Sequence, residues 1–149
     1  MKVFIVFSAL LMMGFTCVIY QGDVNRYMHE QETLKMIAEE AACQAALCLD
    51  DAALGTGVRK FADNEAEEAA GKCIESGRKQ LAGGGEYEIR WEMEYEDDVR
   101  GYSRENSLQN PSVTLAVTIK TDDFFRLPFL FKDSITRKSK YEIKGLSAL

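Results

Sequence analysis

One uncharged segment constrains this chain more than any other feature. It runs from Val3 to Tyr20 as VFIVFSALLMMGFTCVIY, directly after Lys2. At about 1.5 Å per residue, a helix of this length measures roughly 27 Å, close to the roughly 30 Å hydrocarbon thickness of a bilayer. The segment therefore predicts one membrane-spanning helix.

The end of the segment bears on whether it is removed. A secretory signal peptide closes on a small-x-small cleavage site, whereas this segment closes on TCVIY at residues 16–20. A lipoprotein signal needs a small residue directly before the modified cysteine, and Cys17 follows Thr16 instead. We expect an uncleaved anchor over residues 1–21, with a cleaved signal and a lipidated Cys17 as the alternatives.

The flanks of the span predict its orientation. Lys2 precedes it, whereas acidic residues outnumber Arg26 and Lys35 shortly after it, in agreement with the positive-inside rule. A span placed ahead of one domain also serves to export that domain. We expect a single-pass protein of the cell membrane, with a cytoplasmic N-terminus and with residues 22–149 extracytoplasmic.

Length and charge limit the partners of this domain. The roughly 128 residues after the anchor suffice for one hydrophobic core. The net charge is −6, and the 18 basic residues are interspersed with 24 acidic ones. Because nucleic-acid binding needs a clustered basic surface, we expect no nucleic-acid partner.

The membrane helix is predicted to continue as a stem over residues 22–54, which contain good or neutral helix formers. Its apolar stripe on a helical wheel consists of Leu34, Ala38, Ala41, Ala45, Cys48, Leu49 and Ala52. A second stripe, on the opposite side, consists of Met36, Cys43, Leu47 and Leu54. We expect the first stripe to face the domain and the second to face a neighbouring chain.

A second helix is predicted over residues 63–82, after Gly55-Thr56-Gly57 ends the stem. One of its faces consists mainly of small residues, namely Ala66, Ala69, Ala70, Cys73, Ile74, Gly77 and Leu81. Small side chains let helix axes approach closely. The two helices are therefore expected to form a close antiparallel hairpin.

Residues 86–145 are predicted to form a sheet. Inward and outward residues alternate over residues 86–96, 112–121 and 137–145, which predicts three strands, with Trp91 on a buried face. Residues 97–111 form a polar loop. Pro128 excludes a regular strand from residues 122–133. That second loop is expected to cover the open end of the sheet with Phe124, Leu127 and Leu130.

The predicted fold is α+β: a transmembrane helix that continues as a stem, and a helical hairpin on a small, mainly antiparallel sheet of three to four strands. The outward residues of the first strand include Glu88, Glu92 and Glu94. Those of the last strand include Lys138, Lys140 and Lys144. Opposite charges on neighbouring strands are favourable, so we expect these two strands to be adjacent.

Four cysteines are present, one of them, Cys17, within the span. In an oxidising compartment two of the other three would pair. Cys43 and Cys48 are five residues apart on one helix and point about 140° apart, so they do not bond to each other. The possible disulfide joins Cys73 to Cys43 or to Cys48, and the choice stays open.

The sequence offers no catalytic or metal-binding constellation. His29 is the single histidine, and no nucleophile is placed beside it. Glu88, Glu92 and Glu94 on one strand face are more typical of a solvated surface than of a glycosidase. The C-x4-C spacing is not that of a zinc site, and the glycines at 83–85 precede a strand and not a helix. We expect no enzyme, no metal and no cofactor.

An apolar helix that continues as an amphipathic stem, followed by a small sheet, resembles the layout of pilins and pseudopilins. Together with the second helix, AEEAACQAAL at residues 38–47 and SVTLAVTIKT at residues 112–121 resemble the TadE-like minor pilins of tight-adherence, type IV-like pilus systems. Prepilins of this class have a glutamate five residues after a glycine. Here FTCVI follows Gly14, which favours an unprocessed accessory protein.

This resemblance implies a structural or assembly component of a surface pilus or of a type II/IV-like secretion apparatus. Its partners would be the lipid bilayer and other pilin-like subunits, contacted through the N-terminal helix. The alternative is a membrane-anchored extracytoplasmic binding or sensor domain. In that case residues 97–111 and 124–131 would form a ligand surface.

Overall fold

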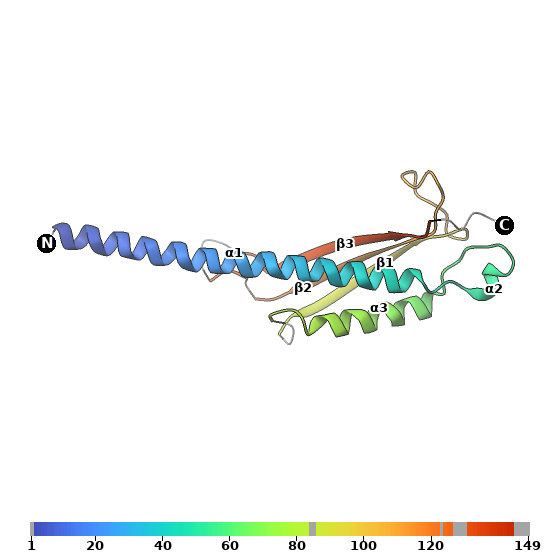
Figure 1. The fold of residues 1–149 in the computed structure, drawn as a ribbon, viewed down its shortest axis with the longest axis horizontal. Helices are drawn as coiled ribbons and strands as arrows, with labels where there is room; N and C mark the ends of the chain where they lie inside the picture. The colour runs from blue at the N-terminus through green and yellow to red at the C-terminus, as the bar shows by residue number, and fades with distance from the viewer. Residues whose placement is uncertain (1, 84–85, 123, 127–130, 145–149) are drawn as a thin grey trace.

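A single long helix sets the outline of the molecule. The computed structural model describes residues 2–83, 86–122, 124–126 and 131–144. The elements follow in the order α1 (Lys2–Ala46), α2 (Asp51–Leu54), α3 (Asp63–Arg78), β1 (Glu88–Glu96), β2 (Ser112–Lys120) and β3 (Ser134–Glu142). The first part of α1 extends alone, and the other elements gather around its second part (Figure 1). The long apolar helix and the small antiparallel sheet confirm an α+β layout.

Helix α1 contains 45 residues and continues through Gly22 without interruption, so it is roughly 67 Å long at 1.5 Å per residue. It buries side chains only from Asp23 onward. The buried apolar ones are Leu34, Ile37, Ala38, Ala41, Ala42, Ala45 and Ala46. The helical part of the predicted inner stripe is therefore confirmed, and Met36 and Leu47 of the opposite stripe are exposed.

The stem is shorter than the sequence predicted, since α1 ends at Ala46 and not at Leu54. Leu49 forms an isolated β-bridge with Phe61, which requires extended backbone at this point. Asp50 then accepts hydrogen bonds from two backbone N–H groups of α2 and begins that helix, as an aspartate at the N-cap position does. The segment Gly55-Thr56-Gly57, predicted to end the stem, therefore follows α2 instead.

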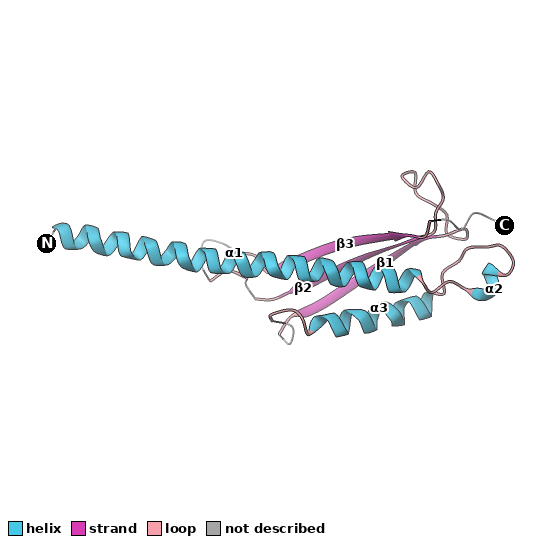
Figure 2. Ribbon diagram, in the orientation of Figure 1, coloured by secondary structure: helices cyan, strands magenta, loops and turns pink. Residues whose placement is uncertain are grey.

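Helix α3 lies beside the second part of α1 (Figure 2). Its residues Ala66, Ala70, Ile74 and Gly77 are buried, as predicted. A Cβ atom at Gly77 would lie only 2.6 Å from Cγ1 of Ile37, so glycine is required for the helices to approach this closely. The helix ends at Arg78, four residues before the predicted end at residue 82.

The sheet has the order β1-β2-β3, and both strand pairs are antiparallel. One face of the central strand β2 is fully buried, with Val113, Leu115, Val117 and Ile119 packed in the core. Trp91 of β1 packs against α3. A Cβ atom added at Gly71 of α3 would lie 3.8 Å from Cζ2 of Trp91, which is van der Waals contact. The predicted inward orientation of Trp91 is confirmed.

The predicted adjacency of the first and last strands is wrong, because β2 lies between them. The strand with the most continuous apolar face takes the centre, where it is covered most completely. One opposite-charge contact still forms across β2, since Lys140 Nζ lies 3.2 Å from Glu96 Oε2. Strand β3 also begins three residues before the predicted Arg137, because Ile135 pairs with Ile119.

The two long connections lie at opposite ends of the sheet (Figure 1). The β1–β2 loop, residues 97–111, is at the end far from the apolar part of α1. The described residues of the β2–β3 connection, 121–122, 124–126 and 131–133, are at the end where that part of α1 leaves the domain. Phe124 in this connection is buried, as predicted, whereas Leu127 and Leu130 lie outside the described residues.

Candidate functional site

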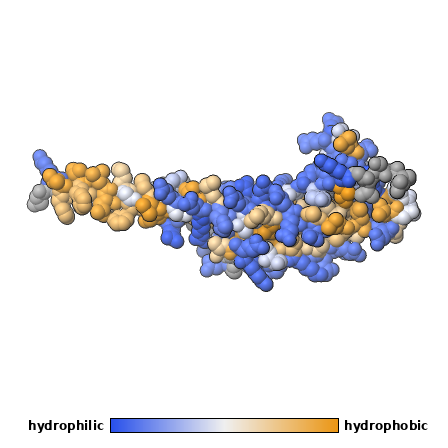
Figure 3. All heavy atoms as spheres, viewed as in Figure 1, coloured by the Kyte–Doolittle hydropathy of each residue, from blue (hydrophilic) through white to orange (hydrophobic). Residues whose placement is uncertain are grey.

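The apolar part of α1 is uncovered along its length. Within the described residues, α1 is the one helix long and apolar enough to cross a membrane, and none of its most apolar 18-residue window is buried. On the face shown in Figure 3, the side chains of this part of α1 are mostly hydrophobic, whereas the surface of the domain contains many hydrophilic residues. A helix that is apolar all round and lacks protein neighbours needs an apolar environment. The bilayer is the environment that fits its length.

The two segments considered for a ligand surface, residues 97–111 and the described part of 124–131, lie at opposite ends of β2. The nine residues of this strand extend about 26 Å at 3.3 Å per residue. Phe124 is also part of the core, packed against the rings of Tyr27 and Tyr87, with centroid distances of 5.7 Å in both cases. The two loops are therefore separate surfaces.

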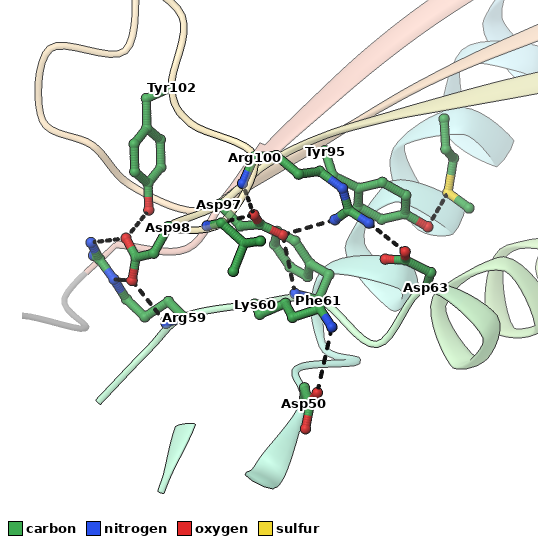
Figure 4. A network of polar contacts seen from close by, with 12 residues as sticks. Asp50, Arg59, Lys60, Phe61, Asp63, Tyr95, Asp97, Asp98, Arg100 and Tyr102 are labelled. Carbon is green, nitrogen blue, oxygen red and sulfur yellow. Dashed lines mark hydrogen bonds and ion pairs between the residues drawn. The ribbon is translucent and has the colours of Figure 1, made fainter. Parts of the chain in front are cut away.

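A polar network ties the β1–β2 loop to the segment before α3 (Figure 4). Its centre is Asp97, which has no exposed surface. Asp97 accepts hydrogen bonds from the backbone N–H groups of Val99, Arg100 and Phe61 at 3.0, 2.8 and 3.4 Å, and from the Arg100 guanidinium at 2.8 Å. Arg100 also forms an ion pair with Asp63 of α3. These contacts close the distal end of the core.

A second part of the network is more exposed. The backbone N–H of Arg59 donates to Asp98 at 2.8 Å, and its guanidinium donates to both carboxylate oxygens. These hydrogen bonds hold the pKa of Asp98 well below its usual range. The hydroxyl of Tyr102 donates to the same carboxylate at 2.6 Å. Burial, reinforced by this hydrogen bond, raises the pKa of Tyr102. The charge of Asp98 is thus compensated by Arg59, which lies in the segment before α3.

Glu96 joins the same loop to β3. Its carboxylate accepts hydrogen bonds from Asn106, Ser112 and Lys140 at 2.8, 3.1 and 3.2 Å. Burial alone would raise the pKa of this carboxyl group. These hydrogen bonds and one from Ser103 outweigh burial and lower the pKa to about 2.

We expect Glu96 to make the stability of the domain sensitive to acid. Because its pKa is lowered from 4.5 to about 2 on folding, its contribution is complete above about pH 4.5 and is lost as the pH falls toward 2. Replacing Glu96 with Gln should reduce the dependence of the stability of the domain on pH in this range. Thermal unfolding between pH 2 and 6 measures this dependence. The matched control is Glu94→Gln at an exposed position of the same strand. Equal pH profiles for Glu96→Gln and the unmodified chain would contradict the expectation.

Two carboxylates are buried on the stem. Glu30 has no exposed surface, and its Oε1 accepts hydrogen bonds from the Tyr87 hydroxyl and the Ala82 N–H, both at 3.0 Å. Asp23 accepts a hydrogen bond from the Arg126 N–H at 2.9 Å. The sequence analysis missed both residues. A signal was available for Glu30, because it lies four residues before Leu34 on the buried face of α1.

A groove of about 570 Å³ runs between α1 and α3. Its lining residues are mostly polar or charged and include Glu40 and Gln44 on α1 and Glu65, Lys72 and Cys73 on α3. No histidine is among them, and Cys73 is the one thiol of the lining. The groove is an open surface between two helices, and its chemistry does not define a reaction.

All four cysteines are free in this structure, and the bridge from Cys73 to Cys43 or Cys48 stays a prediction. The backbone oxygen of Cys48 accepts a hydrogen bond at 3.0 Å from the N–H of Ala62, directly before α3. Cys73 lies eleven residues further along, or about 16 Å at 1.5 Å per residue, which is beyond disulfide distance from Cys48. Burial raises the pKa of both thiols.

The remaining residues singled out in the sequence are exposed. His29 lies on the exposed side of α1, and Glu88, Glu92 and Glu94 lie on the outer face of β1. In the part of the chain that the structure describes, no group of three or more His, Cys, Asp or Glu side chains could hold a metal ion. No protein-family model, no curated protein and no solved structure matches this chain.

Proposed function

We propose that this chain is a non-enzymatic, membrane-anchored structural or assembly component of a surface pilus or a type II/IV-like secretion apparatus. The observation that carries the proposal is the continuity of α1, in which an uncovered apolar segment and the core helix of a small α+β domain are one helix. This is the layout of pilin-like subunits. The chain would be a single-pass protein with its N-terminus cytoplasmic and its domain extracytoplasmic.

The outer face of α1 supports packing against other subunits. Met28, Met36 and Leu47 are exposed there, on the side turned away from the domain. They are separate apolar contact points on a face that also contains the exposed residues His29, Glu32 and Glu39. A second copy or another pilin-like subunit would cover this face with its own helix.

A specific observation also favours the alternative, a membrane-anchored binding or sensor domain. Val99 and Leu108 are exposed hydrophobic residues on the β1–β2 loop, whose base is fixed by the Asp97 network. A rigid loop base with apolar side chains above it is a suitable contact surface for a protein ligand. Its position at the far end of the domain leaves it accessible from outside the cell.

Photo-crosslinking in native membranes distinguishes the two functions. A crosslinkable residue would replace Met36 on α1 or Leu108 on the β1–β2 loop. Crosslinks from Met36 to copies of this chain or to other proteins with an N-terminal apolar helix are expected. Crosslinks from Leu108 alone would favour the binding or sensor domain. If the crosslinker at Met36 forms no crosslink to another protein chain, the proposed assembly role is contradicted.

A further inference from the structure

The outer face of the sheet has its charges in two separate columns. Helices α1 and α3 lie on the other face (Figure 2), which contains the buried side chains of β2 and Trp91 of β1. On the outer face, β1 presents the exposed acids Glu92 and Glu94, and β3 presents the exposed bases Lys138 and Lys140. The middle of β2, between these columns, has only threonine and alanine on this face.

The strand pairing places acid and base at the same height. In two neighbouring rows across the sheet, an acid of β1, a short side chain of β2 and a lysine of β3 are aligned. These rows are Glu92, Ala116 and Lys138, and Glu94, Thr114 and Lys140. Two interstrand spacings, or about 9.5 Å, separate the acid of a row from its base. Among the described residues, no ion pair involves Glu92, Glu94 or Lys138.

Anchoring in one bilayer restricts how two copies of this chain can be related. A two-fold axis that relates copies of the same orientation runs along the membrane normal, because an axis in the membrane plane would invert one span. The strands run roughly along α1 (Figure 1), so this axis is roughly parallel to β2. Rotation by 180° about such an axis in front of the outer face exchanges the two edges of the sheet and keeps the height of every residue. Each residue of β1 then faces the β3 residue of its own row.

We propose that the outer sheet face binds a second copy of this chain about this axis, with Glu92 of each copy paired to Lys138 of the other. The inference rests on the proposed membrane anchoring by residues 3–20, which gives both copies one orientation. Glu94 and Lys140 face each other in the same way, and every contact occurs twice, as in other isologous interfaces. Charge selects a second copy as the occupant, because this face is complementary to itself.

Two rows place like charges across the axis, and a nearby opposite charge compensates each of them. Glu96 comes opposite Glu142 of the second copy, but Lys140 contacts both carboxylates within one chain, at 3.2 and 3.7 Å. Lys120, at the end of β2, faces its own equivalent, but Glu88 is its direct neighbour on β1. Neither row therefore opposes the contact made by the two rows between them.

Photo-crosslinking in vesicles tests this contact. A small diazirine-bearing residue would replace Thr114, which lies near the axis, in the full chain reconstituted in phosphatidylcholine vesicles at low protein density. The variants Glu92→Lys and Lys138→Glu would contain the same crosslinker and two different tags. Glu75→Lys on α3, where the side chain is 71% exposed, is the matched control, because it changes the net charge as Glu92→Lys does.

The unmodified chain and Glu75→Lys are expected to form crosslinked dimers. Glu92→Lys or Lys138→Glu alone should form about tenfold less, because each exchange turns two symmetry-related attractions into repulsions. A mixture of these two variants should restore the dimer, and only between chains with unlike tags, because each variant then supplies the charge that the other needs. Absence of dimers from the unmodified chain, or equal yields from all variants, overturns the sheet contact.

Failure of this contact is distinguishable from failure of the proposed function. Crosslinks from Met36 in native membranes, without dimers from the Thr114 position, overturn the sheet contact and leave the assembly role intact. Carbonate extraction of the reconstituted chain from the vesicles overturns the anchoring, and with it the shared orientation on which the sheet contact depends.

Discussion

A chain lacking residues 2–20 is expected to leave the membrane fraction and to remain folded. The deleted residues bury no side chain in the domain, whose buried residues begin at Asp23. Each Leu, Ile, Phe or Val in a span favours insertion by about 0.3 to 0.6 kcal/mol, so the deletion removes nearly all of the anchoring free energy. Carbonate extraction of membranes measures the first outcome. Cooperative thermal unfolding of the released protein measures the second.

A point substitution provides the matched control for this deletion. Leu11→Arg near the centre of the span should weaken insertion by about 3 to 4 kcal/mol, whereas Leu11→Ala should leave the chain in the membrane. A shortened chain that still resists carbonate extraction would contradict anchoring by this helix. A shortened chain that is unfolded would show that the span contributes to the stability of the domain.

Replacing Asp97 with Ala is expected to lower the free energy of unfolding by about 2 to 4 kcal/mol. The substitution removes the acceptor of four hydrogen bonds, three of them from backbone N–H groups. A buried donor left without an acceptor costs about 1 to 3 kcal/mol, which applies to the Phe61 N–H, whereas the part-buried N–H groups of Val99 and Arg100 cost less because water reaches them. Arg100 loses a partner as well, but it is partly exposed and retains Asp63. Urea unfolding followed by Trp91 fluorescence measures the change.

The neighbouring aspartate is the natural control for this experiment. Asp98 forms a bidentate contact with Arg59, but its side chain and that of Arg59 are each about one quarter exposed, at 26% and 23%. Ion pairs near the surface contribute about 0 to 1 kcal/mol, so Asp98→Ala should have a much smaller effect. Equal losses in the two variants would mean that burial of Asp97 is not the source of its importance.

Periodicity predicted the faces of the helices and strands well. Alternation in residues 86–96 placed Trp91 inward, and helical spacing identified Ala66, Ala70 and Gly77 as buried. These patterns depend only on the geometry of each element. Strand order is different, because a period of two specifies the face of a residue and not its neighbouring strand. For that reason charge alone predicted the wrong neighbour for β1.

The buried carboxylates could not be predicted in the same way. A charged residue is expected to be exposed unless it has partners, and the partners of these residues come from distant parts of the chain. Glu30 accepts a hydrogen bond from the N–H of Ala82, 52 residues away in the sequence. Asp97 accepts one from the N–H of Phe61, 36 residues away. The early end of the stem depended likewise on the pairing of Leu49 with Phe61.

The absence of a break in α1 has a mechanical consequence. The domain is not tethered by a flexible linker, so it cannot rotate independently of the segment in the bilayer. A helix of residues 20–46 rises about 39 Å above the end of the span at 1.5 Å per residue. A tilt of 10° in the membrane would therefore displace the end of this lever by about 7 Å. Force applied to the domain would reach the bilayer along the same helix without an intervening joint.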